Sequence, residues 1–153
     1  MNIEQKVKAR GLEWPKTAPA ALANYVTVRR TGDLLFLSGA GPFVDGKQVY
    51  TGRVGQEVSL EEARKAAEIA AVNLLSMVEG ELGNLEHVRI IKLLGFVNSA
   101  NDFFEQPSVI DAASDLLAEL LGENGKHARS AIGTSVLPFN IPVEIEMVAE
   151  ILK

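Results

Sequence analysis

The chain has 153 residues, of which 47% are hydrophobic and 23% charged, and its formal net charge is −5. This length fits one domain with a real hydrophobic core, and the composition excludes a disordered chain. The absence of cysteine excludes disulfides, thiolate metal ligands and cysteine nucleophiles. No apolar run is long enough to cross a bilayer and the N-terminus has no signal-peptide pattern, so we expect a cytoplasmic protein without a membrane partner.

The charge and the histidines also limit the partners. An acidic chain without a Lys/Arg stripe lacks the attraction to phosphates on which nucleic-acid binding depends, which argues against a nucleic-acid partner. His87 and His127 lie far apart in the sequence, and neither sits in a cluster with metal-ligand spacing. We therefore expect no metal ion and no other cofactor.

The first element is a short N-terminal helix. Residues 2–10 are predicted to be helical, because Asn2 and Gln5 have the spacing of a capping pair. A proline-punctuated connection follows it. We expect residues 1–19 to be an N-terminal extension of a single domain that spans residues 1–153.

A β-hairpin comes next. Two β-rich runs, residues 24–30 and 33–38, are separated by Thr31-Gly32, where the glycine supplies a left-handed turn position. The second run is apolar on both faces, which is typical of a central strand. A weak third strand is predicted at residues 47–50.

Two amphipathic helices and a strand occupy the middle of the chain. Ser59 opens a capping box, and the helix that follows has an alanine-rich apolar stripe and ends at Gly80 or Gly83. Residues 88–97 form a strand that is apolar on both faces. A second helix is predicted over residues 107–121.

Two extended runs end the chain, within residues 127–152, on either side of a Leu137-Pro138 break. Arg129 lies on the first run. The second alternates apolar and acidic residues, and Glu144 is the first of its glutamates. If the two runs are neighbours in the sheet, Arg129 and Glu144 face one pocket, on the sheet face that the helices leave bare.

The order of elements indicates an α+β fold, with a mixed sheet of about six strands and two main helices on one face. The opposite face carries apolar side chains. Leaving it in water costs roughly 25 cal/mol per Å² of apolar surface. We therefore expect that an oligomer covers this face.

Two segments resemble a known family. The run from Tyr25 through Gly32-Asp33-Leu34-Leu35-Phe36-Leu37-Ser38-Gly39 is similar to the first hairpin of the RidA/YjgF family, also named endoribonuclease L-PSP. Arg129-Ser130-Ala131-Ile132, Leu137-Pro138 and residues 143–149 resemble its C-terminal signature. The resemblance covers roughly residues 20–152. It implies a chorismate-mutase-like fold and a homotrimer with sites in the clefts between subunits.

The resemblance also implies an activity. Members of this family hydrolyse reactive 2-imino or enamine acids, such as 2-iminobutanoate and 2-iminopropanoate, to 2-keto acids and ammonia. On this basis Arg129 binds the substrate carboxylate and Glu144 orients the attacking water. Tyr25 helps to close the pocket, and backbone groups near Gly39 and Ala131 contact substrate or water.

The chain departs from the family pattern at several positions, which indicates a divergent branch. Ala131 stands where the family frequently has cysteine, and Ala40 stands where it has glutamine. The usual asparagine of the second helix falls near Ile110 or Asp111. The cysteine change removes a thiol but leaves the backbone groups in place.

Three alternatives remain open beside the imine deaminase. One is a non-catalytic trimeric module that binds small acids or regulates. Another is a deaminase of a different enamine, such as an aminomuconate-type ring-cleavage product. The third is a ribonuclease, against which the acidic charge and the lack of paired histidines argue.

Overall fold

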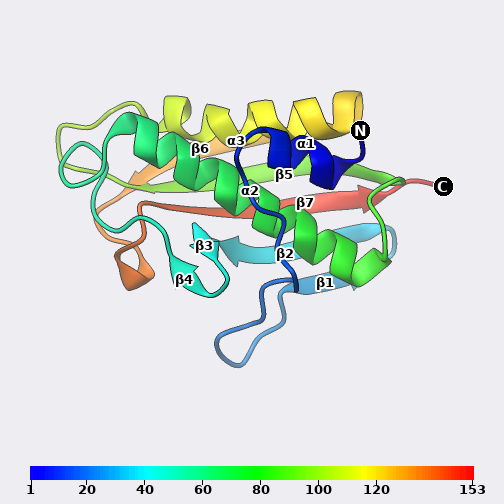
Figure 1. Ribbon diagram of the computed structural model, residues 1–153. Coiled ribbons are helices and arrows are strands. Elements are labelled where there is room, and N and C mark those ends of the chain that lie inside the picture. The colour runs from blue at the N-terminus through cyan, green and yellow to red at the C-terminus, as the bar shows by residue number, and fades with distance from the viewer.

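A mixed five-stranded sheet with two long helices on one face forms the frame of the protein (Figure 1). The computed structural model describes all residues, 1–153. In chain order the elements are α1 (Ile3–Ala9), β1 (Val28–Thr31), β2 (Leu34–Ala40), β3 (Phe43–Val44), β4 (Lys47–Gln48), α2 (Leu60–Leu82), β5 (Val88–Asn98), α3 (Gln106–Leu121), η1 (Gly122–Gly125), β6 (Ala128–Thr134), η2 (Pro138–Asn140) and β7 (Val143–Ile151).

The strand order of the sheet is β1-β2-β7-β5-β6. Only β5 and β6 are parallel, and the other neighbours are antiparallel. The last strand, β7, therefore lies inside the sheet, and β6 forms an edge. The strand predicted at residues 47–50 is present only as β4, which pairs with β3 in a separate hairpin. The α+β prediction is confirmed, with five strands in the main sheet in place of about six.

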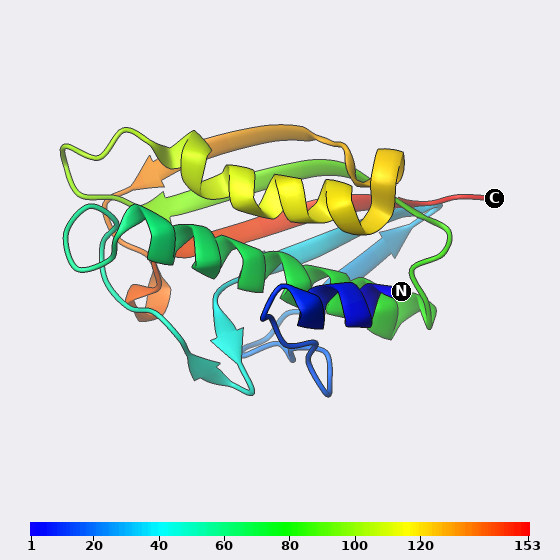
Figure 2. The ribbon, with the colours of Figure 1, turned by 45° about the horizontal axis from the view of Figure 1, so that its top comes forward.

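Local signals place the helices where the sequence predicts them. Ser59 and Glu62 form the predicted capping box, and Gly83, with φ of 83°, ends α2 in the left-handed conformation. The Asn2 and Gln5 pair likewise caps α1. Helix α2 packs on β2 and β7, whereas α3 packs on β5 and β6 (Figure 2).

The alternation of each strand divides its residues between the two faces of the sheet. The predicted apolar face of β7 is buried under the helices, at Val143, Ile145, Met147 and Ala149. The opposite face, which we call the open face, carries half-exposed apolar side chains. Phe36 is 47% exposed and Ile132 46%. The predicted uncovered apolar face is therefore present in the single chain.

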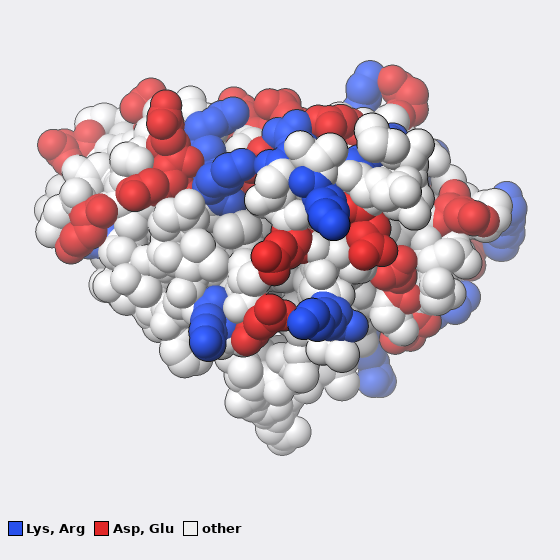
Figure 3. Space-filling model, viewed as in Figure 1, with Lys and Arg blue, Asp and Glu red and all other residues white.

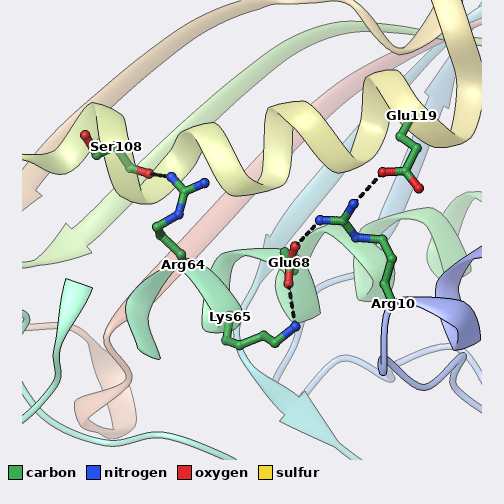
Figure 4. A network of polar contacts seen from close by, with 6 residues as sticks. All are labelled: Arg10, Arg64, Lys65, Glu68, Ser108 and Glu119. Atoms are coloured by element: carbon green, nitrogen blue, oxygen red, sulfur yellow. Dashed lines mark hydrogen bonds and ion pairs between the residues drawn. The ribbon is translucent and has the colours of Figure 1, made fainter. Parts of the chain in front are cut away.

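Arg10 of the N-terminal segment contacts both long helices, α2 and α3 (Figure 4). Arg10 Nη2 donates to Glu68 Oε1 of α2 at 2.6 Å, and Arg10 Nη1 contacts Glu119 of α3. Lys65 Nζ lies 3.2 Å from the second oxygen of Glu68. Val7 is fully buried in the core. Residues 1–12 therefore contribute to the core that α2 and α3 form.

The surface over the helices is highly charged, with basic and acidic side chains interspersed over much of it (Figure 3). Among the helices, none combines the length and the hydropathy needed to span a bilayer.

The buried position of Glu68 predicts a stability effect. Glu68 is only 7% exposed, and Arg10→Ala leaves it with Lys65 as its sole partner. Removing one partner from a buried charged group costs about 1–3 kcal/mol, and we expect Arg10→Ala to lower the free energy of unfolding by that amount. Urea unfolding followed by circular dichroism measures the change. Glu119→Ala is the control: its side chain is 47% exposed, so we expect less than about 0.5 kcal/mol. Equal losses in both variants would contradict this role of Glu68.

Candidate functional site

Arg129 lies on the edge strand β6 and faces α3. In the parallel pairing Arg129 is opposite Leu93 of β5, and Leu93 is fully buried under the helices. Paired residues point to the same face of a sheet, so Arg129 lies on the helix-covered side. There its Nη1 donates to Asp111 Oδ1 at 2.7 Å and to Ser114 Oγ at 3.2 Å.

The remaining donors of Arg129 form a fork. Both partners, Asp111 and Ser114, bind Nη1, whereas Nε and Nη2 make no hydrogen bond within the chain. The side chain is 23% exposed, so small molecules can reach it at the sheet edge. A guanidinium with its Nε and Nη2 edge free is suited to bidentate binding of a carboxylate.

Glu144 lies on the open face, on β7. Its partners in the sheet are Phe96 of β5 on one side and, close by on the other, Gly39 of β2. A Cβ atom at Gly39 would lie 2.9 Å from Cδ of Glu144, so any larger residue there would displace this carboxylate. Burial raises the pKa of Glu144, and the neighbouring charge of Glu146 raises it further.

The expected pocket shared by Arg129 and Glu144 does not exist within one chain. Strand β5 lies between β6 and β7, and the two side chains point to opposite faces of the sheet. Standard strand spacings put their Cα atoms roughly 14 Å apart. Arg129 is also not on the bare face, because α3 covers it. The expectation of a common pocket on that face is therefore wrong for the single chain.

The structure divides the predicted site residues into two groups. Ala131 faces the same way as Arg129 and lies opposite Gly95 of β5. Gly39 belongs with Glu144 on the open face. Tyr25 precedes β1, is 48% exposed, and its hydroxyl accepts a long 3.4 Å hydrogen bond from the backbone N–H of Leu22.

A shallow hollow of about 380 Å³ extends along the open face from Glu146. One row of paired residues crosses its floor: Phe36 of β2 and Val148 of β7, with Arg29 of β1 at one end and Lys92 of β5 at the other. The hollow thus combines an apolar floor with two cations and an acid. Its remaining lining residues are Val26, Leu37, Ser38, Leu94 and Met147.

Three residues that contact Arg129, directly or through one another, are not predicted as site residues. Asp111 and Ser114 lie three positions apart on α3, on one face of the helix. That spacing is visible in the sequence, but nothing in it shows that this face meets β6. His127 contacts Ser114 through its Nε2 atom at 2.9 Å. No three acidic or histidine side chains come together as a metal site would require.

The chain is similar to known proteins over nearly its whole length. The chain is 38% identical to the protein TCP17 of Trypanosoma cruzi over 152 residues, which are 98% of this chain and 94% of that protein. It is 46% identical to Atu1372 of Agrobacterium tumefaciens, a protein described as of unknown function, with a TM-score of 0.90 over 97% of this chain and 92% of that one.

More distant structures share the fold. The YjgF gene product of E. coli is 24% identical, with a TM-score of 0.64 over 88% of this chain and 93% of that chain. The sequence model described as "YjgF/chorismate_mutase-like, putative endoribonuclease" matches residues 4–151, almost the whole chain. The chain therefore belongs to the YjgF/RidA family.

Proposed function

We propose that the protein hydrolyses 2-imino acids, in the reaction R–C(=NH₂⁺)–COO⁻ + H₂O → R–CO–COO⁻ + NH₄⁺. The observation that carries the proposal is the state of Arg129. Asp111 and Ser114 hold one nitrogen of its guanidinium, and the Nε and Nη2 edge stays free for a carboxylate. Each such charge-assisted hydrogen bond contributes about 1.5–3 kcal/mol.

Glu144 supplies the base that the reaction needs. The carbon of a protonated imine is already electrophilic, so attack requires only a water held by an acceptor. Glu144 takes one proton from that water as the C–O bond forms and returns it as ammonia leaves. Because burial and Glu146 raise the pKa of Glu144, its carboxylate is a stronger base toward that water than an exposed glutamate is.

Arg129 and Glu144 act on one substrate only if two copies of the chain meet. The sheet edge of one copy, with Arg129, then lies against the open face of the next, with Glu144. An edge-to-face contact uses two different surfaces, so it is heterologous, and such contacts form a ring when the rotation between copies closes. The proposal is therefore a cyclic oligomer, and a homotrimer by resemblance to the family.

The open face carries the apolar and charged side chains that such a contact between two copies needs. Its apolar floor includes Phe36 and Ile132, nearly half of each exposed. Arg29, Lys92 and Glu146 make no ion pair within the chain, and all three line the hollow. Charges of both signs beside an apolar centre are suited to a second copy, which offers complementary charges of its own.

The words "putative endoribonuclease" in the family description favour one competing activity, cleavage of RNA. The net charge of −5 weakens that alternative, because it gives little attraction to a phosphate backbone. Arg129 also shares its charge with Asp111. A planar fork beside a neutralising acid fits one carboxylate better than a polyanion.

Mixing two inactive variants tests the activity and the split site together. We expect Arg129→Ala and Glu144→Gln each to reduce ketoacid formation from 2-iminobutanoate, generated in the assay, by at least about tenfold. Refolding the two variants together in equal amounts restores about one quarter of the wild-type sites, because a site is intact only when each copy supplies its unmutated half. Steady-state rates measure both effects.

Arg129→Ala refolded with Arg129→Gln is the matched control, and it stays inactive because both chains lack the same half. Failure of the complementary mixture to regain activity, despite mixed oligomers, would contradict a site between copies. A wild-type protein that binds 2-oxobutanoate in a thermal-shift assay without any turnover would instead favour a binding module.

The pKa of Glu144 predicts the pH dependence of the rate. A base must be ionised, so kcat/KM falls as the pH drops through this pKa, and the acid limb lies above the ordinary glutamate value of 4.5. Glu146→Gln removes a neighbouring negative charge and lowers the pKa of Glu144, so we expect the limb to move to lower pH. Glu150→Gln is the control, because Glu150 is paired with Arg89. An acid limb that Glu146→Gln leaves in place would rule out Glu144 as its source.

Analytical ultracentrifugation tests the role of the open face. We expect the wild-type protein to sediment with the mass of three chains, and Phe36→Asp to sediment as a single chain, because the charge lies in the apolar centre of the contact. Val49→Asp is the matched control: Val49 is 45% exposed, but it follows the β3–β4 hairpin. Monomeric wild-type protein, or trimeric Phe36→Asp, would argue against this interface.

A further inference from the structure

A chain of hydrogen bonds runs from the turn after α3 to Arg129. The His127 ring lies between two partners: Nδ1 is 2.6 Å from the carbonyl oxygen of Gly125, and Nε2 is 2.9 Å from Ser114 Oγ. Ser114 Oγ is in turn 3.2 Å from Arg129 Nη1. In the chemistry set out above Ser114 appears only as a partner of Arg129, and His127 has no role.

When His127 is neutral, only one direction of donation satisfies every member of this hydrogen-bond chain. A backbone carbonyl can only accept, so Nδ1 of His127 carries the proton and donates to Gly125. In a neutral ring Nε2 is then an acceptor, and the single hydroxyl hydrogen of Ser114 points to it. Ser114 Oγ consequently presents its lone pairs to Arg129. In a protonated ring Nε2 would instead donate to Ser114 Oγ, so this direction of donation belongs to the neutral ring.

The Gly125 end of this hydrogen-bond chain is closely packed. Gly125 closes η1, the turn between α3 and β6, and is buried against the end of α3. A Cβ atom at Gly125 would lie 2.1 Å from the carbonyl oxygen of Leu117, so the backbone of the turn packs directly on the helix. The carbonyl that holds His127 is therefore fixed relative to Ser114 on the same helix.

We propose that Ser114 and His127 are positioning residues for the carboxylate site, which hold Arg129 by Nη1 and thereby aim its Nε and Nη2 edge at the acid. The inference rests on the proposed function in one respect only: Arg129 is the residue that donates hydrogen bonds to the substrate carboxylate. Neither residue touches the substrate. Asp111 fixes the other hydrogen of Nη1, so the guanidinium is held at one end and open at the other.

The charges around His127 agree with a neutral ring. Burial has the largest effect on the pKa of His127 and lowers it. The hydrogen bond to Gly125 acts in the opposite direction, and the nearby positive charge of Arg129 lowers the pKa further. Asp111 of α3 is bound to Arg129. The Glu123 and Lys126 pair of the same turn is well exposed. The ring is therefore poised to accept from Ser114 near neutral pH.

NMR of the two histidines tests the direction of donation between His127 and Ser114. In ¹⁵N-labelled protein we expect His127 to be the Nδ1–H tautomer. Ser114→Ala removes a donor that stabilises the neutral ring, so the pKa of His127 rises. The NMR signals of His87 are the internal reference. A protonated Nε2 in the neutral ring, or a fall in the pKa of His127 in Ser114→Ala, would overturn the inference.

Binding of 2-oxobutanoate tests positioning without requiring turnover. We expect Ser114→Ala and His127→Leu to raise its Kd about fivefold, the effect of one net hydrogen bond, with kcat nearly unchanged where turnover is measurable. His127→Gln keeps an acceptor for Ser114 and retains the wild-type Kd. Ser108→Ala, on the same helix and without a side-chain hydrogen bond, is the matched control.

The outcomes separate the inference from the proposed function. Fivefold weaker binding in Ser114→Ala without any imine hydrolysis by the wild-type protein supports the positioning role and removes the deaminase. Normal hydrolysis with an unchanged Kd and KM in Ser114→Ala overturns the positioning role and leaves the deaminase standing.

Discussion

The register of strand β5 with its neighbours determines on which face of the sheet each residue of the proposed site lies. Strand β5 lies between the edge strand β6, to which it is parallel, and the central strand β7, to which it is antiparallel. Since side chains alternate along a strand, the register with β5 assigns Arg129 to the helix-covered side and Glu144 to the open side. A shift of one residue in either pairing would exchange these faces. The pairing of buried residues such as Leu93 and Met147 prevents such a shift.

Helix α3 determines how the arginine is presented. A lone exposed arginine samples many rotamers, and ordering it on binding costs about 1–2 kcal/mol of side-chain entropy. Asp111 and Ser114 hold Arg129 before any ligand arrives. The ion pair itself contributes little to stability, because the Asp111 side chain is 49% exposed. Its effect is on geometry, and the same geometry leaves the Nε and Nη2 edge free.

The sequence predicts what depends on neighbours along the chain. The capping boxes at Asn2 and Ser59 and the turn at Gly32, which has φ of 57°, follow from a few adjacent residues. The alternation of β7 follows from period-two spacing. The strand order is set by contacts between distant segments: the chain joins β6 directly to β7, but β5 lies between them in the sheet. The contacts of Arg129 with Asp111 and Ser114 on α3 cannot be predicted for the same reason.

The family resemblance located Arg129 and Glu144, and the fold shows what their use requires. Each belongs to a different surface of the chain, so a site that contains both joins two copies. A crystal structure of the protein with bound 2-oxobutanoate tests this most directly. The account predicts the carboxylate on Nε and Nη2 of Arg129 from one copy. Glu144 of a neighbouring copy then accepts a hydrogen bond from a water beside the keto carbon. An acid bound wholly within one chain, or away from Arg129, would contradict it.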